Sequence, residues 1–390
     1  MDASINQRTV QPAAVVLIAA MLMSIGLVMV ASATASLDQP VFATRIWTTA
    51  LGRQGIFILA GLGIILATAW LSDRILSSPV LRVRMSRVLF VIATLLLAAA
   101  LIPGLANPHR GSHRWLGLSP LGLAIGFQPS ELAKLALVVL LASLLGDRDA
   151  NPRSFFRAFM PAMGAIAICV ALVGKENFGT AVLLAVVAVG VLFMAGCRLH
   201  HLLLIGAIGV AGLTVLLYAA PYRLARIAAF RDFWGDPQGA GYQPLQSLVT
   251  IASGGWFGAG LGSGIQKYGY LPESHTDFVF AVVCEELGIF GGGLVIGLFC
   301  AFVWVGLRTM LAAATPFERL LAFGLAFVVA VQAAMNIAVV TVMTPTTGVP
   351  LPMLSAGGSG MFMTCAMVGV LAAVAARGGR SAETERARAS

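Results

Sequence analysis

The chain has 390 residues, of which 59% are hydrophobic and 11% are charged, with a net charge of +9 and a mean hydropathy of +0.92. Soluble globular domains carry about 25% charged residues, so this composition excludes a soluble protein and indicates a polytopic membrane protein. No basic tract is dense enough to predict nucleic-acid binding. The five cysteines lie in or beside apolar segments without a CxxC pair, which supports neither a zinc site nor a disulfide framework.

Ten apolar segments are long enough to cross a bilayer as helices. Their approximate cores are 13–34, 51–71, 87–104, 129–146, 158–174, 178–196, 200–220, 278–307, 318–342 and 358–376. The fifth and sixth are separated only by a polar turn at 174–177. We therefore predict an all-α polytopic membrane protein with ten transmembrane helices in a single domain, residues 13–376.

The first apolar segment and its ASATAS flank mimic a cleaved signal peptide. It is long enough to span a membrane and many more spans follow, so we predict an uncleaved first helix. Ten crossings place both termini on one side, where the connecting loops carry more lysine and arginine. The positive-inside rule makes that side the cytoplasm, with tails at 1–12 and 377–390. A long loop at 221–277, between helices seven and eight, is then extracytoplasmic.

The stretch LPESHTDFVFAVVCEELG (271–288) places polar residues, ending in Asp277, directly before an apolar run. An ionisable group at a membrane boundary is costly, which indicates a function. Asp277 has the properties of a general base, a carboxylate beside a low-dielectric region. Capping of the next helix is an equally good explanation at this point. Glu285 and Glu286 lie further into the run, and we expect them to pack against protein.

Two other stretches face the same predicted side. Glu131 and Lys134 are three residues apart on one helix face, after Arg114-Trp115, and form either a structural ion pair or part of a polar cavity. The segment 344–360 contains three prolines and four glycines. Irregular backbone at membrane depth must be buried in protein or line a cavity. The glycine-dense segment 254–264 predicts a tight re-entrant turn rather than a nucleotide site.

These residues leave two classes of protein open. One is an enzyme acting on a lipid-linked or extracellular substrate, and the other is a transporter. Inverted repeats with charges at the membrane midplane are typical of transporters. No repeat is evident here, and Asp277 lies at a boundary.

Four motifs together resemble the SEDS family, which includes FtsW, RodA and SpoVE. They are FQPSELAKLALV (127–138), GYQPLQSLVTIASGGWFGAGLG (241–262), YLPESHTDFVFAVVCEELG (270–288) and TGVPLPMLSAGGSG (347–360). The resemblance implies a peptidoglycan glycosyltransferase of the bacterial cytoplasmic membrane, with both termini in the cytoplasm. It implies lipid II as substrate. It also implies a class B penicillin-binding protein transpeptidase and other division or elongation proteins as partners, and no nucleic acid.

The resemblance also implies site residues. Asp277 matches the family's essential aspartate and is predicted to act as general base on the acceptor sugar. Predicted substrate-binding residues share these motifs or flank them: Trp115, Arg114, Glu131, Lys134, Glu273, His275, Thr276, Ser355 and Ser359. The leaving pyrophosphate needs positive charge, from Lys134, from Arg114 or from a divalent cation, magnesium or manganese. No cofactor is otherwise expected.

Three positions depart from the family's motifs: Asn177 replaces an acid, Ala356 a tyrosine and Gly360 a serine. Asp277 and its neighbours are intact, so we predict an active polymerase. The stretches at 226–230 and 241–247 favour the FtsW division type over the RodA elongation type. A lipid II flippase is the alternative of another class, and a non-catalytic scaffold for the transpeptidase is a third.

Overall fold

The computed structural model describes residues 11–34, 50–102, 106–109, 112–118, 125–147, 152–219, 221–266 and 268–389. Most of the predicted N-terminal tail, 1–12, lies outside these residues. Ten long helices correspond to the ten predicted segments. They are α1 (Pro12–Ala33), α2 (Ala50–Ser77), α3 (Pro79–Ala100), α4 (Pro129–Leu145), α5 (Met160–Glu176), α6 (Phe178–Met194), α7 (Leu199–Tyr218), α10 (Val279–Ala312), α11 (Pro316–Val340) and α12 (Gly358–Ala389).

Local sequence signals set the starts of several helices. Proline occupies the first turn of α1, α3, α4 and α11, where its missing amide costs no hydrogen bond. Ser78 and Asn177 accept hydrogen bonds from amides of α3 and α6. Asn177 stands where the family's motif has an acid. Its side-chain oxygen caps α6, a role that a carboxylate can also fill.

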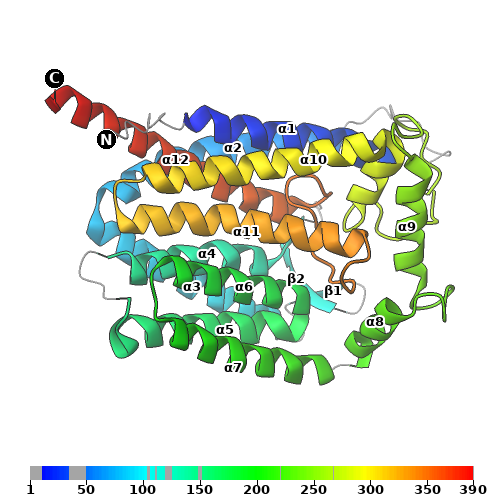
Figure 1. Ribbon diagram of the computed structural model, residues 1–390, viewed down its shortest axis with the longest axis horizontal. Helices are drawn as coiled ribbons and strands as arrows, with labels where there is room; N and C mark the ends of the chain where they lie inside the picture. Colours follow the sequence, from blue (N-terminus) through cyan, green and yellow to red (C-terminus); the bar gives the residue numbers. More distant parts are fainter. Residues whose placement is uncertain are drawn as a thin grey trace, which may run out of the picture.

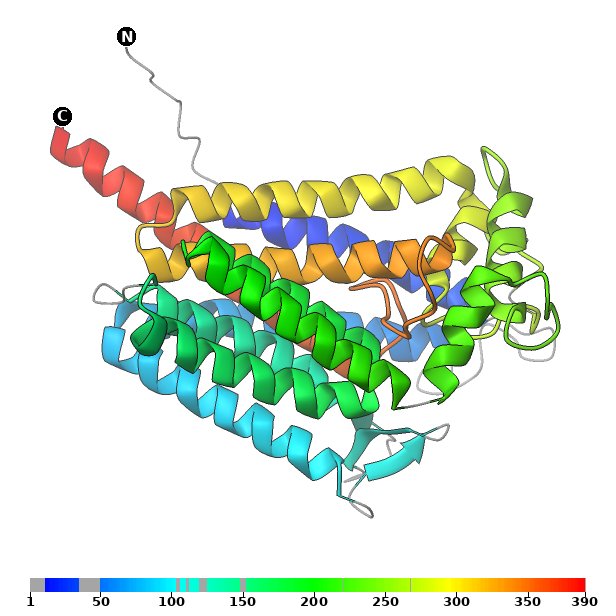
Figure 2. The ribbon, with the colours of Figure 1, turned by 60° about the horizontal axis from the view of Figure 1, so that its bottom comes forward.

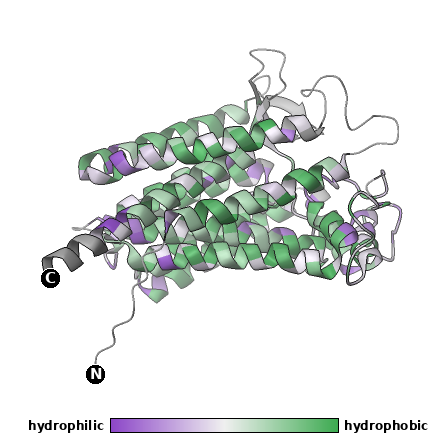
Figure 3. Cartoon of the chain, turned by 90° about the horizontal axis from the view of Figure 1, so that it is seen from above, coloured by the Kyte–Doolittle hydropathy of each residue, from purple (hydrophilic) through white to green (hydrophobic). Residues whose placement is uncertain are grey.

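Eight of the helices are long and apolar enough to cross a membrane. The helices α4 and α6 have 17 residues each, about 25 Å, which is near the lower limit for a span. The count of ten spans therefore stays a prediction. Apolar residues run along the long helices (Figure 3). Among the eight, α12 and α11 are the most buried, and α2 and α7 expose most of their apolar surface, as lipid-facing helices do.

The chain between α7 and α10 contains two short helices, α8 (Pro221–Arg231) and α9 (Tyr242–Gly254). They lie across one end of the bundle, the end opposite the start of α1 and the end of α12 (Figure 1). Arg223 of α8 donates to the carbonyls of Gly174 and Lys175 at the end of α5 and to Leu216 of α7. A cation at helix C-termini is stabilising. The loop predicted at 221–277 is thus folded onto the bundle. We call the end of the bundle that it covers the loop end.

A small antiparallel sheet, which the sequence did not indicate, lies at the same end (Figure 2). Its strands are β1 (Ala106–His109), β2 (Ser112–Leu118) and β3 (Ile125–Phe127), in the order β1-β2-β3. Leu116 pairs with Phe127, and β3 leads directly into α4. The sheet therefore fixes the chain that enters α4.

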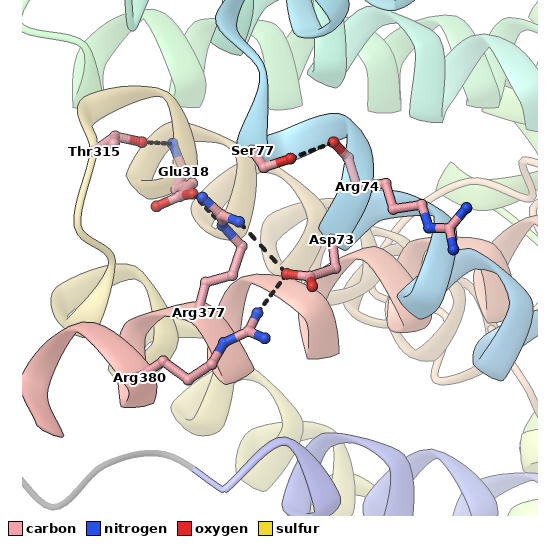
Figure 4. Close-up of polar contacts among 7 residues, drawn as sticks. All are labelled: Asp73, Arg74, Ser77, Thr315, Glu318, Arg377 and Arg380. Carbon is pink, nitrogen blue, oxygen red and sulfur yellow. Dashed lines mark hydrogen bonds and ion pairs between the residues drawn. The ribbon is translucent and has the colours of Figure 1, made fainter. Parts of the chain in front are cut away.

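The opposite end of the bundle carries a charge cluster formed by α2, α11 and α12 (Figure 4). Arg377 Nε lies 2.8 Å from Glu318 Oε1, and Arg377 Nη1 lies 3.5 Å from Asp73, which also pairs with Arg380. Thr315 Oγ1 accepts a hydrogen bond from the Glu318 amide at 3.2 Å. The segment that follows residue 376 therefore begins as a continuation of α12 that is tied to the bundle.

Replacing Arg377 by methionine is expected to destabilise the protein by about 3 kcal/mol, because Glu318 is 1% exposed and loses its cation. Thermal unfolding in detergent measures this change. Arg380→Ala is the control, since Arg380 is exposed and its pair contributes at most about 1 kcal/mol. Equal effects of the two substitutions would show that burial of Glu318 does not decide the stability of this end.

Candidate active site

Asp277 lies in a tight turn, 272–278, that precedes α10 at the loop end. The turn is built around Glu273, whose φ is +56° and whose carbonyl accepts the amides of Thr276 and Phe278 at 3.1 and 3.2 Å. The Glu273 carboxylate accepts the Thr276 hydroxyl at 2.8 Å. Phe278, not Asp277, occupies the N-cap position of α10. The turn is therefore stabilised by Glu273 and Thr276, two of the predicted binding residues.

Three successive carbonyls of this turn are held by neighbouring segments. The Asp277 carbonyl accepts Asn336 Nδ2 at 2.8 Å, and the Thr276 carbonyl accepts the Ser355 hydroxyl at 2.6 Å. The His275 carbonyl accepts the amide of Ala356 at 2.8 Å. Hydrogen bonds on consecutive residues fix the backbone on which the Asp277 side chain stands.

Ser355 and Ala356 belong to the segment that follows α11, which carries the predicted motif TGVPLPMLSAGGSG (347–360). Ser355 also accepts the Leu351 amide at 2.8 Å, so its hydroxyl joins two parts of the segment to the Asp277 turn. Asn336 likewise donates to the Val349 carbonyl at 2.9 Å. Residues 351–355 of this irregular backbone are buried, as irregular backbone at membrane depth must be, whereas 344–348 are partly or fully exposed. We call residues 344–357 the support segment.

Glu131 and Lys134 form a buried ion pair on α4. The distance from Lys134 Nζ to Glu131 Oε2 is 2.7 Å, and the two side chains are 1% and 3% exposed, respectively. Lys134 also donates to Gln332 Oε1 at 2.6 Å, and Gln332 Nε2 donates to the Pro350 carbonyl at 2.9 Å. The pair therefore reaches the support segment through Gln332.

Gln332 and Asn336 were not among the predicted site residues. They are four residues apart and therefore lie on one face of α11, where one holds the ion pair and the other holds the Asp277 turn. The sequence contained a usable signal, because two amide side chains at helical spacing inside an apolar span are costly unless they are paired. Through these residues the structure connects the Lys134 pair with the Asp277 turn.

The other predicted residues lie around the start of α4. The Trp115 ring of β2 lies against Gly126 of β3, where a Cβ atom would come within 2.6 Å of it. The Ser359 hydroxyl accepts the amide of Gln128 at 3.3 Å. A Cβ at Gly360 would lie 3.6 Å from Glu131 Oε2, so the missing serine leaves space beside this carboxylate. The side chain of Arg114 lies outside the described part. The roles of all these residues in substrate binding stay predictions.

Asn336→Leu is expected to lower stability by about 1–3 kcal/mol, because the carbonyls of Asp277 and Val349 lose their donor in a buried site. We expect any activity that depends on Asp277 to fall as well at a temperature where the variant is folded. Thr341→Ala, at the C-cap of α11, is the control, because the Thr341 hydroxyl donates to carbonyls at the end of the same helix. Thermal unfolding and turnover at saturating substrate measure the two effects. Unchanged turnover in a destabilised variant would contradict the positioning role.

The chain is similar to known proteins along most of its length. Residues 12–378 match the model of the FtsW, RodA and SpoVE family, described as cell cycle proteins. Stage V sporulation protein E of Bacillus subtilis (strain 168) is 37% identical over 362 residues, which cover 91% of this chain and 94% of that protein. A probable peptidoglycan glycosyltransferase FtsW of Nitrosococcus halophilus (strain Nc4) is 40% identical over 360 residues, covering 90% and 88%.

Solved structures give the same result at the level of the fold. A chain of a peptidoglycan synthase complex that coordinates polymerization and crosslinking matches with a TM-score of 0.71 and 28% identity, covering 93% of this chain and 97% of that chain. The rod shape determining protein RodA of Thermus thermophilus matches with a TM-score of 0.63 and 26% identity, covering 93% and 95%.

Proposed function

This chain belongs to the FtsW, RodA and SpoVE family, and from this membership we propose that it is a peptidoglycan glycosyltransferase of the FtsW type that polymerises lipid II. Several relatives at 37–40% identity are named FtsW or stage V sporulation protein E. RodA-type elongation is the alternative within the family, and the T. thermophilus RodA likeness at 26% identity supports it less.

The way in which the Asp277 turn is held supports its assignment as the active site. The Asp277 turn is held through three consecutive carbonyls by Asn336, Ser355 and Ala356. Catalytic groups must be held in a productive geometry by their surroundings, and here the backbone is fixed while the side chain remains partly exposed. This arrangement favours a catalytic role for Asp277 over a purely structural one.

The proposed reaction is an inverting glycosyl transfer. Asp277 removes the proton from the 4-hydroxyl of the acceptor lipid II N-acetylglucosamine. That oxygen forms a bond to the anomeric carbon of the terminal N-acetylmuramic acid on the donor chain. The bond from this carbon to the pyrophosphate oxygen breaks, undecaprenyl pyrophosphate leaves with the electron pair, and the configuration inverts. General-base assistance contributes about 10²–10⁴-fold to such a rate.

The leaving pyrophosphate carries negative charge that must be offset. The Lys134 charge is already balanced by Glu131 at 2.7 Å, so Lys134 supports the reaction as part of a neutral pair. Arg114 remains a proposed contributor. Among the described residues, His, Cys, Asp and Glu form no group of three that could hold a metal ion. The proposed steps use protein side chains, and a divalent cation stays a prediction.

The loop end is proposed to face the extracytoplasmic side of the bacterial cytoplasmic membrane, with both termini in the cytoplasm. The distribution of lysine and arginine supports this orientation. A class B penicillin-binding protein is the proposed partner. The similar chain in a synthase complex that both polymerises and crosslinks supports this pairing.

Purified protein in lipid vesicles, supplied with lipid II and the cognate transpeptidase, tests the function. We expect glycan chains that are resolved by gel electrophoresis and removed by a muramidase. Movement of labelled lipid II across protein-containing vesicles without polymer would replace the proposal by the transporter alternative. Neither polymer nor movement, with the transpeptidase active, would favour a scaffold.

A further inference from the structure

An apolar surface at the loop end is not used by the proposed reaction. It is formed by exposed side chains of the glycine-rich loop 255–266 and of the adjoining part of α10. We call it the aromatic patch, and its members are Trp256, Phe257, Leu261, Ile265, Ile289 and Phe290. From the observations below we infer that the aromatic patch is a membrane-docking surface that lies in the outer boundary of the lipid bilayer.

The first observation is the position of the patch on a spanning helix. The helix α10 is interrupted at Gly288, where φ is +70° and ψ is −169°. The part that follows, 289–312, is about 36 Å long, enough to cross a hydrocarbon core of about 30 Å. Ile289 and Phe290 therefore lie where this span meets the boundary of the bilayer. Leu294 and Trp304 continue the exposed surface along the same helix face.

The second observation is that the loop is fastened to this boundary. The amides of Ile289 and Phe290 donate to the carbonyls of Gly255 and Trp256 at 3.0 and 3.4 Å. The Phe257 and Phe290 ring centroids are 5.3 Å apart, and those of Trp256 and Phe290 are 6.2 Å apart. The loop therefore lies at the depth at which the span of α10 begins.

The third observation is that the backbone amides of the loop donate hydrogen bonds to two buried glutamates. Glu285 Oε1 accepts the amides of Ile265 and Gln266 at 2.8 and 3.2 Å, and Glu286 Oε2 accepts the amide of Gly262 at 3.0 Å. The carbonyls of the same two glutamates accept the amides of Ala259 and Gly260. The two side chains are 3% and 1% exposed.

In water, solvent can satisfy the exposed amides of a loop. A loop in contact with lipid must satisfy them internally. Glycine is required for this packing, since a Cβ on Gly258 would lie 2.2 Å from the Glu286 carbonyl. Amides of the loop are thus hydrogen-bonded to acceptors inside the protein, while the outward surface of the loop presents apolar side chains.

Lipid fits this surface better than a protein partner does. Residues 255–266 contain no charged side chain, and the six residues of the patch offer only the Trp256 indole N–H as a side-chain donor. Protein interfaces surround their apolar core with a polar rim that hydrogen-bonds across it. Tryptophan is enriched where a membrane meets water. Docking of the patch would hold Glu285, Glu286 and the preceding Asp277 turn at a fixed depth.

Spin labels on single cysteines test this inference with the protein alone in nanodiscs of phosphatidylethanolamine and phosphatidylglycerol. Cys300 is first replaced by alanine, because it is the exposed cysteine. Phe257→Cys places a label in the patch, where the native side chain is 82% exposed. Trp234→Cys places the control label in the turn between α8 and α9, where the native side chain is 68% exposed. Both labelled variants should unfold at the wild-type temperature.

At position 257 we expect collisions with oxygen to exceed collisions with a water-soluble nickel chelate, and the reverse at position 234. Ile265→Cys, 65% exposed, is a second patch position should the first variant fold poorly. Equal nickel accessibility at 257 and 234 would overturn the inference. Protection of 257 that arises only when the transpeptidase is added would also overturn it, in favour of a protein-docking surface.

Discussion

Glycan polymerisation by the Asp277→Asn variant is expected to fall by about 10²–10⁴-fold, the usual contribution of a general base. The substitution keeps the size of the side chain and removes its ability to take up a proton. The hydrogen bond from Asn336 Nδ2 at 2.8 Å goes to the backbone carbonyl of residue 277, so it is retained. Stability and binding of the transpeptidase should therefore change little.

Lipid II, the cognate transpeptidase and vesicle-reconstituted protein are needed to measure this loss, at equal protein amounts and unfolding temperatures. Asp232→Asn is the matched control. Asp232 is exposed in the same long loop and accepts the Gly235 amide at 2.9 Å, which an asparagine oxygen can also accept. Wild-type amounts of polymer from Asp277→Asn would remove Asp277 from the mechanism. Equal losses in both variants would show that the assay does not report on the active site.

The sequence predicted the spanning helices well because an apolar segment of sufficient length has few alternatives in a bilayer. Starts were marked by prolines and by caps such as Asn177. The sheet of β1, β2 and β3 was missed, since strands of three to seven residues carry little periodicity. The helices α8 and α9 were missed because their apolar stretches are too short to be spans.

The sequence predicted the charged residues of the candidate site but not its amide residues. Asp277, Glu131 and Lys134 stand out because charge is rare in an apolar chain. Gln332 and Asn336 do not, although their amides connect the ion pair and the Asp277 turn. The connection depends on the support segment passing beside α11, and no local pattern in the sequence fixes that path. Glu285 and Glu286 were expected to pack against protein, and the structure confirms it through their bonds to the glycine-rich loop.

Lys134→Met is expected to have the largest effect on stability, a loss of about 3–5 kcal/mol. The substitution leaves Glu131 buried without its cation and removes the donor to Gln332. The double variant Glu131→Leu with Lys134→Met replaces the whole pair by apolar side chains. Such replacements are often neutral or stabilising, so most of the stability should return. Thermal unfolding of the single and double variants in the same detergent measures both changes.

Polymerisation by this double variant distinguishes a packing role from a functional one. We expect it to remain at least about tenfold below wild type, equivalent to about 1.4 kcal/mol in the transition state. The reason is that Gln332 then holds the Pro350 carbonyl without support from Lys134, so the support segment beside the Asp277 turn is less firmly held. Recovery of both stability and polymerisation would identify the pair as an element of packing alone.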